Sequence, residues 1–274
     1  MADGRDVKRT YPAGVPCWVD VEQPDVRASA AFYGALFGWS FIEAGQTGSD
    51  QPYLFAQLDG QDVGALEAGD TGAGWVSYLS SDDIADTCVR LEKAGGIVGV
   101  PPTDGSPYGC SARCADPHGA VFRLWQPGSH PGSQIVNVPG AWNFSDLHTP
   151  DPEASLAFYG DVFGWRIDPD LGAGMIRLPG YGDHLAATID PGIHERQAFA
   201  PPGFADVIAG LTPDSSAFWA IRFTVGDRDE SAALAQTLGA RVESRDDTEW
   251  TKEAVIVDPQ GARFIVSQFD PPKG

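Results

Sequence analysis

The sequence predicts an α+β protein made of four β-α-β-β-β modules, arranged as two tandem copies of one domain. Three observations predict this fold: the chain length, an internal repeat, and short alternating strands that each lead into a helix. The chain has 274 residues, which suits two domains of about 130 residues that can each bury a core. Hydrophobic residues make up 42% and charged residues 20% of the chain, which is typical of a globular protein.

The internal repeat is the strongest of these observations. The stretch PDVRASAAFYGALFGW, which begins at Pro24, returns as PDPEASLAFYGDVFGW from Pro150. The turn DPHGA at Asp116 returns as DPQGA at Asp258. Long matches in the same order indicate that one domain has been duplicated.

The repeat divides the chain into two domains and a linker. We expect a first domain over residues 1–128, a linker over residues 129–140 that is rich in Pro, Gly and Ser, and a second domain over residues 141–274. The second copy is longer between its halves. We therefore predict an inserted loop over residues 194–216, which is either an ordinary surface loop or a lid with apolar tips at Phe199 and Phe204.

Each copy contains two strand–helix pairs. An aspartate opens each helix, where its charge is favoured by the positive end of the helix dipole. Three short strands can follow each helix, so the unit is β-α-β-β-β, used four times. The predicted pairs are 18–22 with 25–37, 76–80 with 83–94, 144–148 with 151–163, and 220–224 with 229–238; strands also follow at 53–58, 63–67 and 120–125.

Composition excludes several classes of partner. The 38 acidic and 18 basic side chains give a formal net charge of -20, and such a surface repels nucleic acids and anionic membranes. No apolar run approaches the roughly 20 residues of a membrane span. Residues 1–14 are polar and lack the apolar core of a signal peptide, so we expect a cytoplasmic protein. Four cysteines in this length do not make a disulfide framework.

These motifs resemble the vicinal-oxygen-chelate superfamily, which includes glyoxalase I, bleomycin-resistance proteins, fosfomycin-resistance enzymes and extradiol dioxygenases. The resemblance rests on Asp25, Phe32-Tyr33 and Phe37-Gly38-Trp39, on their copy, and on the two Asp-Pro-x-Gly turns. It covers nearly the whole chain and points to the tandem glyoxalase-like or "hydroxylase" proteins of actinobacteria. It implies two cup-shaped domains with mixed sheets, each formed by two modules around a ligand site. The fold alone does not imply one function.

The resemblance also implies where a metal would bind. Metal-dependent members take His, Gln or Glu ligands from the first strand of each module and from the last strand of the second module. The matching positions lie seven residues before Asp25, Asp83, Asp151 and Asp227, and seven residues after the turn aspartates Asp116 and Asp258. Aromatic, aliphatic and cationic side chains occupy all of them, so we expect no metal and no other cofactor. The six residues are Trp18, Val76, Arg123, Phe144, Ala220 and Ile265.

The sequence gives only weak evidence for metal ligands at other positions. The five histidines show no metal-binding spacing, and Cys110-x3-Cys114 lacks further ligands, so we expect core or half-buried thiols there.

Strand alternation predicts which side chains line the two cups. Aromatic walls with few polar groups are typical of a ligand pocket, although these rings also suit core filling. Trp250 is placed to close the mouth of the second cup. The first cup is expected to hold Trp18, Asp20, Val76, Tyr78, Arg123 and Trp125, and the second Phe144, Asp146, His148, Ala220, Arg222, Ile265 and Ser267.

Three residues are candidates for catalysis: Asp146, His148 and Asp20. A carboxylate in an aromatic pocket can act as a general base, but one that is paired with Arg123 or Arg222 is a poorer base. His148 makes the second cup the better candidate, or it is simply a histidine at a strand end. The candidate ligand-binding residues are Trp18, Tyr78, Arg123, Trp125, Phe144, Arg222, Ile265, Ser267 and Trp250.

The sequence therefore favours a metal-independent, glyoxalase-like protein that binds an aromatic or polycyclic small molecule. It would tailor or sequester a secondary metabolite, in antibiotic biosynthesis or resistance, and an enzyme that uses an aspartate as acid and base and a pure binder both stay open. The alternative is a metal-dependent lyase or dioxygenase of glyoxalase type. A third possibility is a scaffold that only assembles with a partner; a monomer and a homodimer are equally compatible with the sequence.

Overall fold

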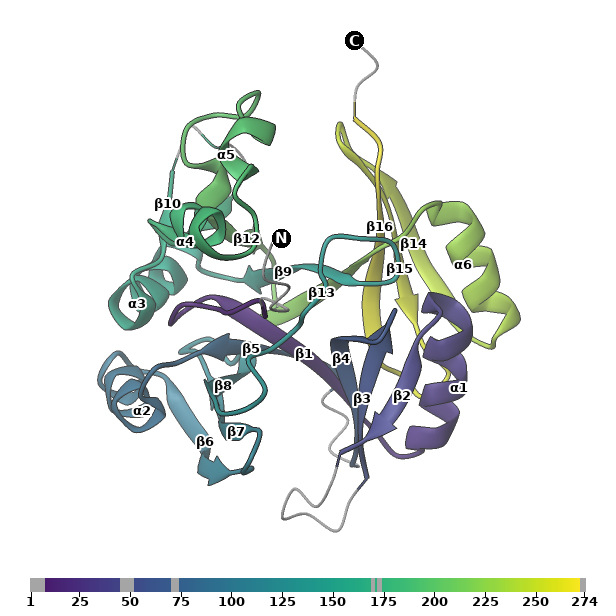
Figure 1. Ribbon diagram of the computed structural model, residues 1–274, viewed down its shortest axis with the longest axis horizontal. Helices are drawn as coiled ribbons and strands as arrows, with labels where there is room; N and C mark the ends of the chain where they lie inside the picture. The colour runs from purple at the N-terminus through teal and green to yellow at the C-terminus, as the bar shows by residue number, and fades with distance from the viewer. Residues whose placement is uncertain (1–7, 45–51, 70–73, 169–170, 172–173, 272–274) are drawn as a thin grey trace, which may run out of the picture. The chain divides into compact units, whose positions relative to one another are not determined.

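The computed structural model describes residues 8–44, 52–69, 74–168, 171 and 174–271 (Figure 1). It confirms the predicted α+β class, with four β-α-β-β-β modules in sequence order. Two eight-stranded mixed sheets have the strand orders β2-β3-β4-β1-β5-β8-β7-β6 and β10-β11-β12-β9-β13-β16-β15-β14. In the part of the chain that is described, no helix combines the length and the apolarity needed to cross a membrane.

The first two modules follow the predicted pattern closely. In each, the first strand pairs in parallel with the last strand, and the remaining strands form antiparallel hairpins. The elements are β1 (Pro16–Gln23), α1 (Val26–Phe37), β2 (Ser40–Glu43), β3 (Tyr53–Leu58) and β4 (Gln61–Ala68), then β5 (Gly74–Ser80), α2 (Ile84–Lys93), β6 (Ile97–Asp104), β7 (Gly109–Ala115) and β8 (Val121–Pro127).

The third and fourth modules repeat this arrangement, with additional helices in the third. The third contains β9 (Trp142–Thr149), α3 (Pro152–Phe163), β10 (Arg166–Ile167), β11 (Met175–Arg177), α4 (Tyr181–Thr188), α5 (Ile193–Arg196), the 3₁₀ helix η2 (Phe204–Asp206) and β12 (Val207–Pro213). The fourth contains β13 (Phe218–Thr224), α6 (Arg228–Thr237), β14 (Arg241–Asp247), β15 (Thr251–Val257) and β16 (Arg263–Phe269).

Aspartates begin the four module helices, as the sequence predicts. Asp25, Asp83, Asp151 and Asp227 are the N-caps, and each side chain accepts a hydrogen bond from a backbone N–H of the first turn. The last helix begins at Arg228, one residue before the predicted start, because Asp227 and not Asp229 is its cap. Helix α1 ends at Phe37 and is capped by Gly38, whose φ of 77° lies in the left-handed region that glycine adopts without strain.

The prediction of a loop over residues 194–216 is wrong in part. Residues 207–213 form β12, which pairs with β9, and the additional helices α4 and α5 lie between β11 and β12. Pro201, Pro202 and Gly203 correctly indicate a break, but they precede η2 and the strand. The apolar side chains of Ile208 and Leu211 are buried, which accounts for a strand where the sequence predicted a loop.

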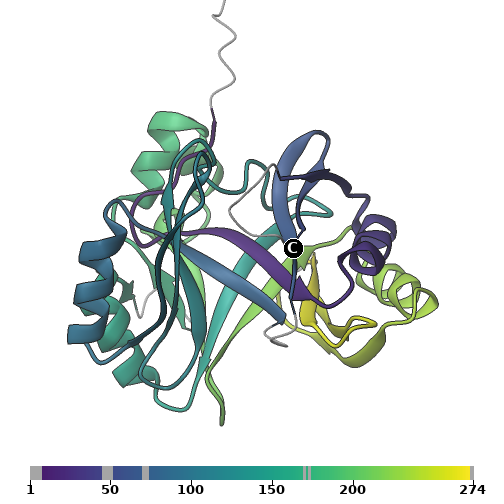
Figure 2. The ribbon, with the colours of Figure 1, turned by 90° about the horizontal axis from the view of Figure 1, so that it is seen from below.

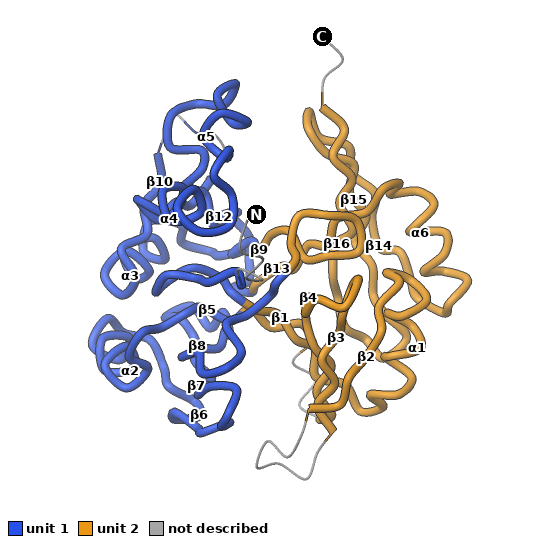
Figure 3. The backbone as a smooth tube through the Cα atoms, viewed as in Figure 1, with its two compact units in different colours: residues 1–17, 78–134, 146–218 blue, residues 18–77, 135–145, 219–274 orange. Residues whose placement is uncertain are grey.

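Packing divides the chain into two compact units that cross the sequence order (Figure 3). Unit 1 comprises residues 1–17, 78–134 and 146–218, so it holds most of the second and third modules. Within unit 1, α2 and α3 lie side by side (Figure 2). Unit 2 comprises residues 18–77, 135–145 and 219–274, and within it α1 lies beside α6.

Candidate functional site

The six strand positions at which the resemblance implies metal ligands hold side chains without suitable donor atoms. The register pairs Tyr78 with Arg123 and Arg222 with Ile265, which fixes β8 and β16 against their parallel neighbours. The described ranges also contain no group of three or more His, Cys, Asp or Glu side chains that could hold a metal ion. The donor set therefore does not fit a divalent cation at Trp18, Val76, Arg123, Phe144, Ala220 and Ile265.

Trp18 and Asp20 are linked through Tyr53 in unit 2. Trp18 Nε1 donates a hydrogen bond to Tyr53 Oη over 3.0 Å, and Tyr53 Oη donates to Asp20 Oδ2 over 3.3 Å. Phe55 packs edge-on against Trp18, with ring centroids 6.0 Å apart. Trp18 and Asp20 are both buried, so this chain of hydrogen bonds fixes a carboxylate within an aromatic wall.

In unit 1, the predicted residues Tyr78, Arg123 and Trp125 lie together. Arg123 Nη1 donates to Tyr78 Oη over 2.5 Å, and the Arg123 guanidinium carbon lies 5.4 Å from the centre of the Tyr78 ring. Trp125 packs edge-on against Tyr78, with ring centroids 6.2 Å apart. Trp125 Nε1 donates to the His130 carbonyl over 2.9 Å, which fixes the indole plane. This arrangement presents aromatic rings beside a cation.

The same unit contains Asp146 and His148, the candidates from the second copy. They lie two residues apart on β9 and therefore share one face of the strand. Asp146 is 5% exposed. His148 Nδ1 lies 3.0 Å from Asp214 Oδ2, and its ring stacks on Phe218 with centroids 4.4 Å apart. The hydrogen bond with His148 is the main cause that lowers the pKa of Asp214 from its ordinary value.

Glu253 organises the fourth module in unit 2. Its Oε1 accepts from Arg222 Nη1 over 2.5 Å, from Thr251 Oγ1 over 3.1 Å and from Ser267 Oγ over 3.3 Å. Arg222, one of the two arginines considered as a partner for the predicted aspartates, therefore pairs with a glutamate of its own module. Ile265 lies opposite Arg222 in the register and is buried.

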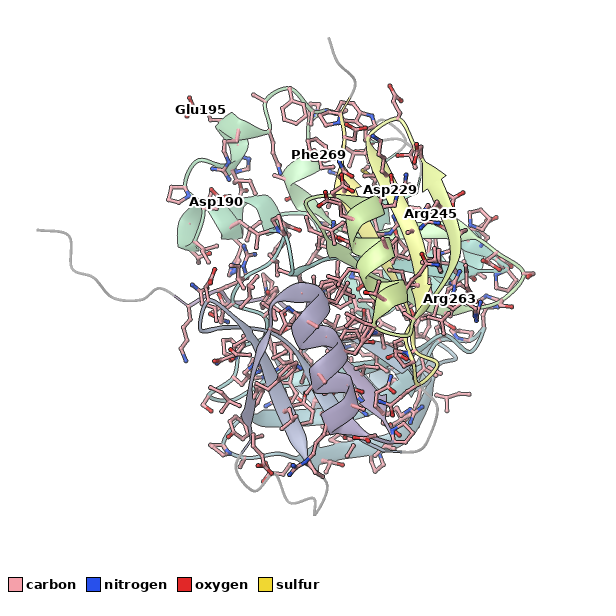
Figure 4. The ribbon with its side chains drawn as sticks, turned by 90° about the vertical axis from the view of Figure 1, so that its right-hand side faces the viewer. Asp190, Glu195, Asp229, Arg245, Arg263 and Phe269 are labelled. Atoms are coloured by element: carbon pink, nitrogen blue, oxygen red, sulfur yellow. The ribbon has the colours of Figure 1, made fainter. Side chains whose placement is uncertain are left out.

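Several other predicted residues lie outside the clusters described above. Trp250 lies in the turn between β14 and β15, where it stacks on Phe269 with ring centroids 6.4 Å apart. Both residues are exposed, Trp250 to 45% and Phe269 to 64%, and Phe269 lies at the end of β16 (Figure 4). Phe144 is half-buried on β9. Phe199, proposed as a lid tip, is 75% exposed after α5.

Sequence reasoning missed three hydrogen-bonding partners of the predicted residues. Tyr53, Asp214 and Glu253 stand 35, 66 and 31 residues from Trp18, His148 and Arg222, respectively. The sequence contained a signal for one of them. If the strands on either side of the turn at Asp258 pair as an antiparallel hairpin, Glu253 lies opposite Ser267. Asp214 fell within the expected loop, so nothing in the sequence pointed to it.

Comparisons with known proteins agree with this architecture. Residues 18–124 match the family model described as Glyoxalase/Bleomycin resistance protein/Dioxygenase superfamily, and residues 144–267 match the model Glyoxalase-like domain. The anthracycline biosynthesis protein DnrV of Streptomyces peucetius is 32% identical over 277 residues, covering 94% of this chain and 94% of DnrV. CFP32 of Mycobacterium bovis is 32% identical over 267 residues, covering 93% of this chain and 95% of CFP32.

Solved structures share the fold at much lower sequence identity. The Mn(II)-bound glyoxalase from Novosphingobium aromaticivorans superposes with a TM-score of 0.60 at 16% identity, covering 93% of this chain and 82% of the glyoxalase. The 2,3-dioxygenase LapB from Pseudomonas sp. KL28 has a TM-score of 0.58 at 15% identity, covering 96% of both chains. The chain belongs to the glyoxalase/bleomycin resistance protein/dioxygenase superfamily, in two tandem copies.

Proposed function

We propose that this protein is a metal-independent member of the superfamily that binds an aromatic or polycyclic small molecule. It tailors or sequesters that molecule in secondary metabolism. The single observation that carries the proposal is the donor chemistry of the six strand positions, where not one side chain is a His, Gln, Glu or Asp.

The side chains around those positions support an aromatic ligand. Trp18 with Phe55, and Tyr78 with Trp125, form two edge-to-face aromatic pairs. The half-buried members of these pairs, Phe55 and Trp125, offer flat apolar surface to a planar molecule, while few polar groups fix its orientation. The similarity to DnrV, an anthracycline biosynthesis protein, supports a polycyclic ligand class.

A fluorescence titration tests the binding. An anthracycline, which is itself fluorescent, is titrated with the wild-type protein and with the Phe55→Leu and Trp125→Leu variants. We expect saturable binding by the wild type and affinities weakened roughly two- to tenfold in the variants, because each loses one aromatic contact. Phe199→Leu is the matched control, since Phe199 is 75% exposed and should not change the affinity. Absence of saturable binding by the folded protein would contradict the proposal.

A second measurement separates the binder from the enzyme. Bound ligand is recovered after incubation and analysed by mass spectrometry, with wild type and Asp146→Asn in parallel. Unchanged ligand in both supports sequestration. A product that is lost in Asp146→Asn, while the circular dichroism spectrum is unchanged, supports tailoring through acid–base chemistry at that carboxylate.

A further inference from the structure

The orientation of the His148 ring is fixed from two sides. Its Nδ1 lies 3.0 Å from Asp214 Oδ2. The Phe218 ring lies nearly parallel to the imidazole, at 17° with centroids 4.4 Å apart, so rotation of the imidazole would break the stacking. Asp214 is itself held, because its Oδ1 accepts from the Ser216 backbone N–H over 3.2 Å and its own N–H donates to the Thr149 carbonyl over 2.9 Å.

This arrangement favours one of the two tautomers of the neutral His148 ring. An ionised carboxylate only accepts hydrogen bonds, so it selects the tautomer of His148 that carries hydrogen on Nδ1. When the ring is neutral, the Nε2 atom of that tautomer is a hydrogen-bond acceptor. Nε2 is buried and has no hydrogen-bond partner among the described residues. A buried acceptor without a donor is unfavourable, and a donor supplied by a ligand would remove that cost.

The position of the ring suits a ligand contact. His148 shares its face of β9 with Asp146, and its neighbour on β12 is Thr212, while Gly210 lies opposite Asp146 and contributes no side chain there. At the matching position the first copy has Glu22, two residues after Asp20, so the imidazole is confined to the second copy. The second copy therefore has an imidazole where the first copy has a carboxylate.

We propose that His148 Nε2 accepts a hydrogen bond from a hydroxyl group on the bound aromatic ligand, and that Asp214 is the positioning residue that holds the acceptor tautomer. The ligand class is therefore a hydroxylated, phenol-type aromatic compound rather than its ether or its unsubstituted parent. This inference rests on the proposed function, because it names the polar group of the ligand that the protein recognises.

The test uses two probes that differ in one donor proton, 2-hydroxyanthraquinone and 2-methoxyanthraquinone. Dissociation constants are measured by quenching of tryptophan fluorescence for the wild type, His148→Phe and Asp214→Asn. We expect the wild type to bind the hydroxyl probe roughly three- to tenfold more tightly than the ether, which corresponds to one net hydrogen bond. His148→Phe keeps a ring to stack on Phe218 and should lose this preference, and Asp214→Asn should reduce it.

The chain offers a matched control in the same unit. His194 Nε2 lies 3.1 Å from Asp183 Oδ1, but their side chains are 54% and 85% exposed. His194→Phe should therefore keep the full preference for the hydroxyl probe. Because Asp214 is one-third exposed in a turn, Asp214→Asn also provides a variant that is expected to fold if His148→Phe does not.

The possible outcomes are distinct. Equal wild-type affinities for the two probes would overturn the assignment of His148 while leaving aromatic binding intact. A preference that persists in both His148→Phe and Asp214→Asn would also overturn it. Failure of the wild type to bind either probe or an anthracycline would overturn the proposed function, and this inference with it.

Discussion

Tyr33 Oη donates a 2.7 Å hydrogen bond to Asp258 Oδ2, although the two residues are 225 positions apart. Tyr33 belongs to the repeated motif of α1, and Asp258 belongs to the repeated turn before β16. Unit 1 contains the equivalent contact, in which Tyr159 Oη donates to Asp116 Oδ2 over 3.3 Å. The two motifs that reveal the duplication therefore join the first module to the fourth and the third module to the second.

Removing the Tyr33 hydroxyl should destabilise unit 2. We expect Tyr33→Phe to lower the free energy of unfolding by about 1–3 kcal/mol, because buried Asp258 loses a hydrogen bond and Trp75 Nε1 loses its acceptor at 3.0 Å. Urea unfolding followed by circular dichroism measures this. Tyr159→Phe is the matched variant and should cost less, since its hydrogen bond is longer. An unchanged unfolding midpoint for Tyr33→Phe would refute the role of this contact.

The same tyrosine predicts how stability depends on alkaline pH. Burial, and secondarily the Asp258 charge, raises the pKa of Tyr33 well above 10. In the unfolded chain a tyrosine ionises at about pH 10, so this contribution to stability is complete below that pH and is lost as the pH rises above it. Urea midpoints measured between pH 8 and 11 should therefore fall for the wild type. A smaller fall is expected for Tyr33→Phe, and identical profiles would count against this explanation.

The four cysteines should differ in reactivity. All four are free thiols, and only Cys110 is not buried. Burial raises the pKa of Cys114 to about 12, so almost none of it is thiolate at neutral pH. A thiol reagent at pH 8 should label Cys110 first and the other three only on unfolding. Cys110→Ser should abolish the fast phase; a fast phase that survives this substitution would show that a buried thiol is accessible.

Glu253 should be important for the stability of the fourth module. We expect Glu253→Gln to lower the free energy of unfolding by about 1–2 kcal/mol, because the Arg222 guanidinium loses its ionic partner and is only 21% exposed. The single variant Arg222→Met and the double variant Arg222→Met/Glu253→Gln complete a double-mutant cycle, which measures the interaction energy of the pair. Additive effects in that cycle would mean that the ion pair contributes nothing.

Local features of the fold could be predicted from the sequence. Strand alternation and helix-opening aspartates depend on neighbouring residues, so the four module helices and the first strand of each module were predicted within one or two residues. The helices α4 and α5 were missed because the glycines and prolines around them resemble a loop. The strand carrying Ile208 was missed for the same reason.

The candidate sites could be predicted only in part. Parity placed Tyr78, Arg123 and Trp125 on one face, and the structure brings them together. The partners Asp214 and Glu253 depend on contacts between segments far apart in the chain, which strand alternation does not encode. The crossed packing of modules was also invisible, because each module carries the same motif and the sequence offers no reason to choose between partners.

Elemental analysis tests most directly whether the protein functions without a metal. The purified protein is analysed as isolated and after incubation with Ni, Zn, Fe and Mn, followed by removal of unbound metal. The donor set at Trp18, Val76, Arg123, Phe144, Ala220 and Ile265 predicts no metal above background in any sample. About one tightly held metal per domain would contradict this account and would favour a metal-dependent lyase or dioxygenase.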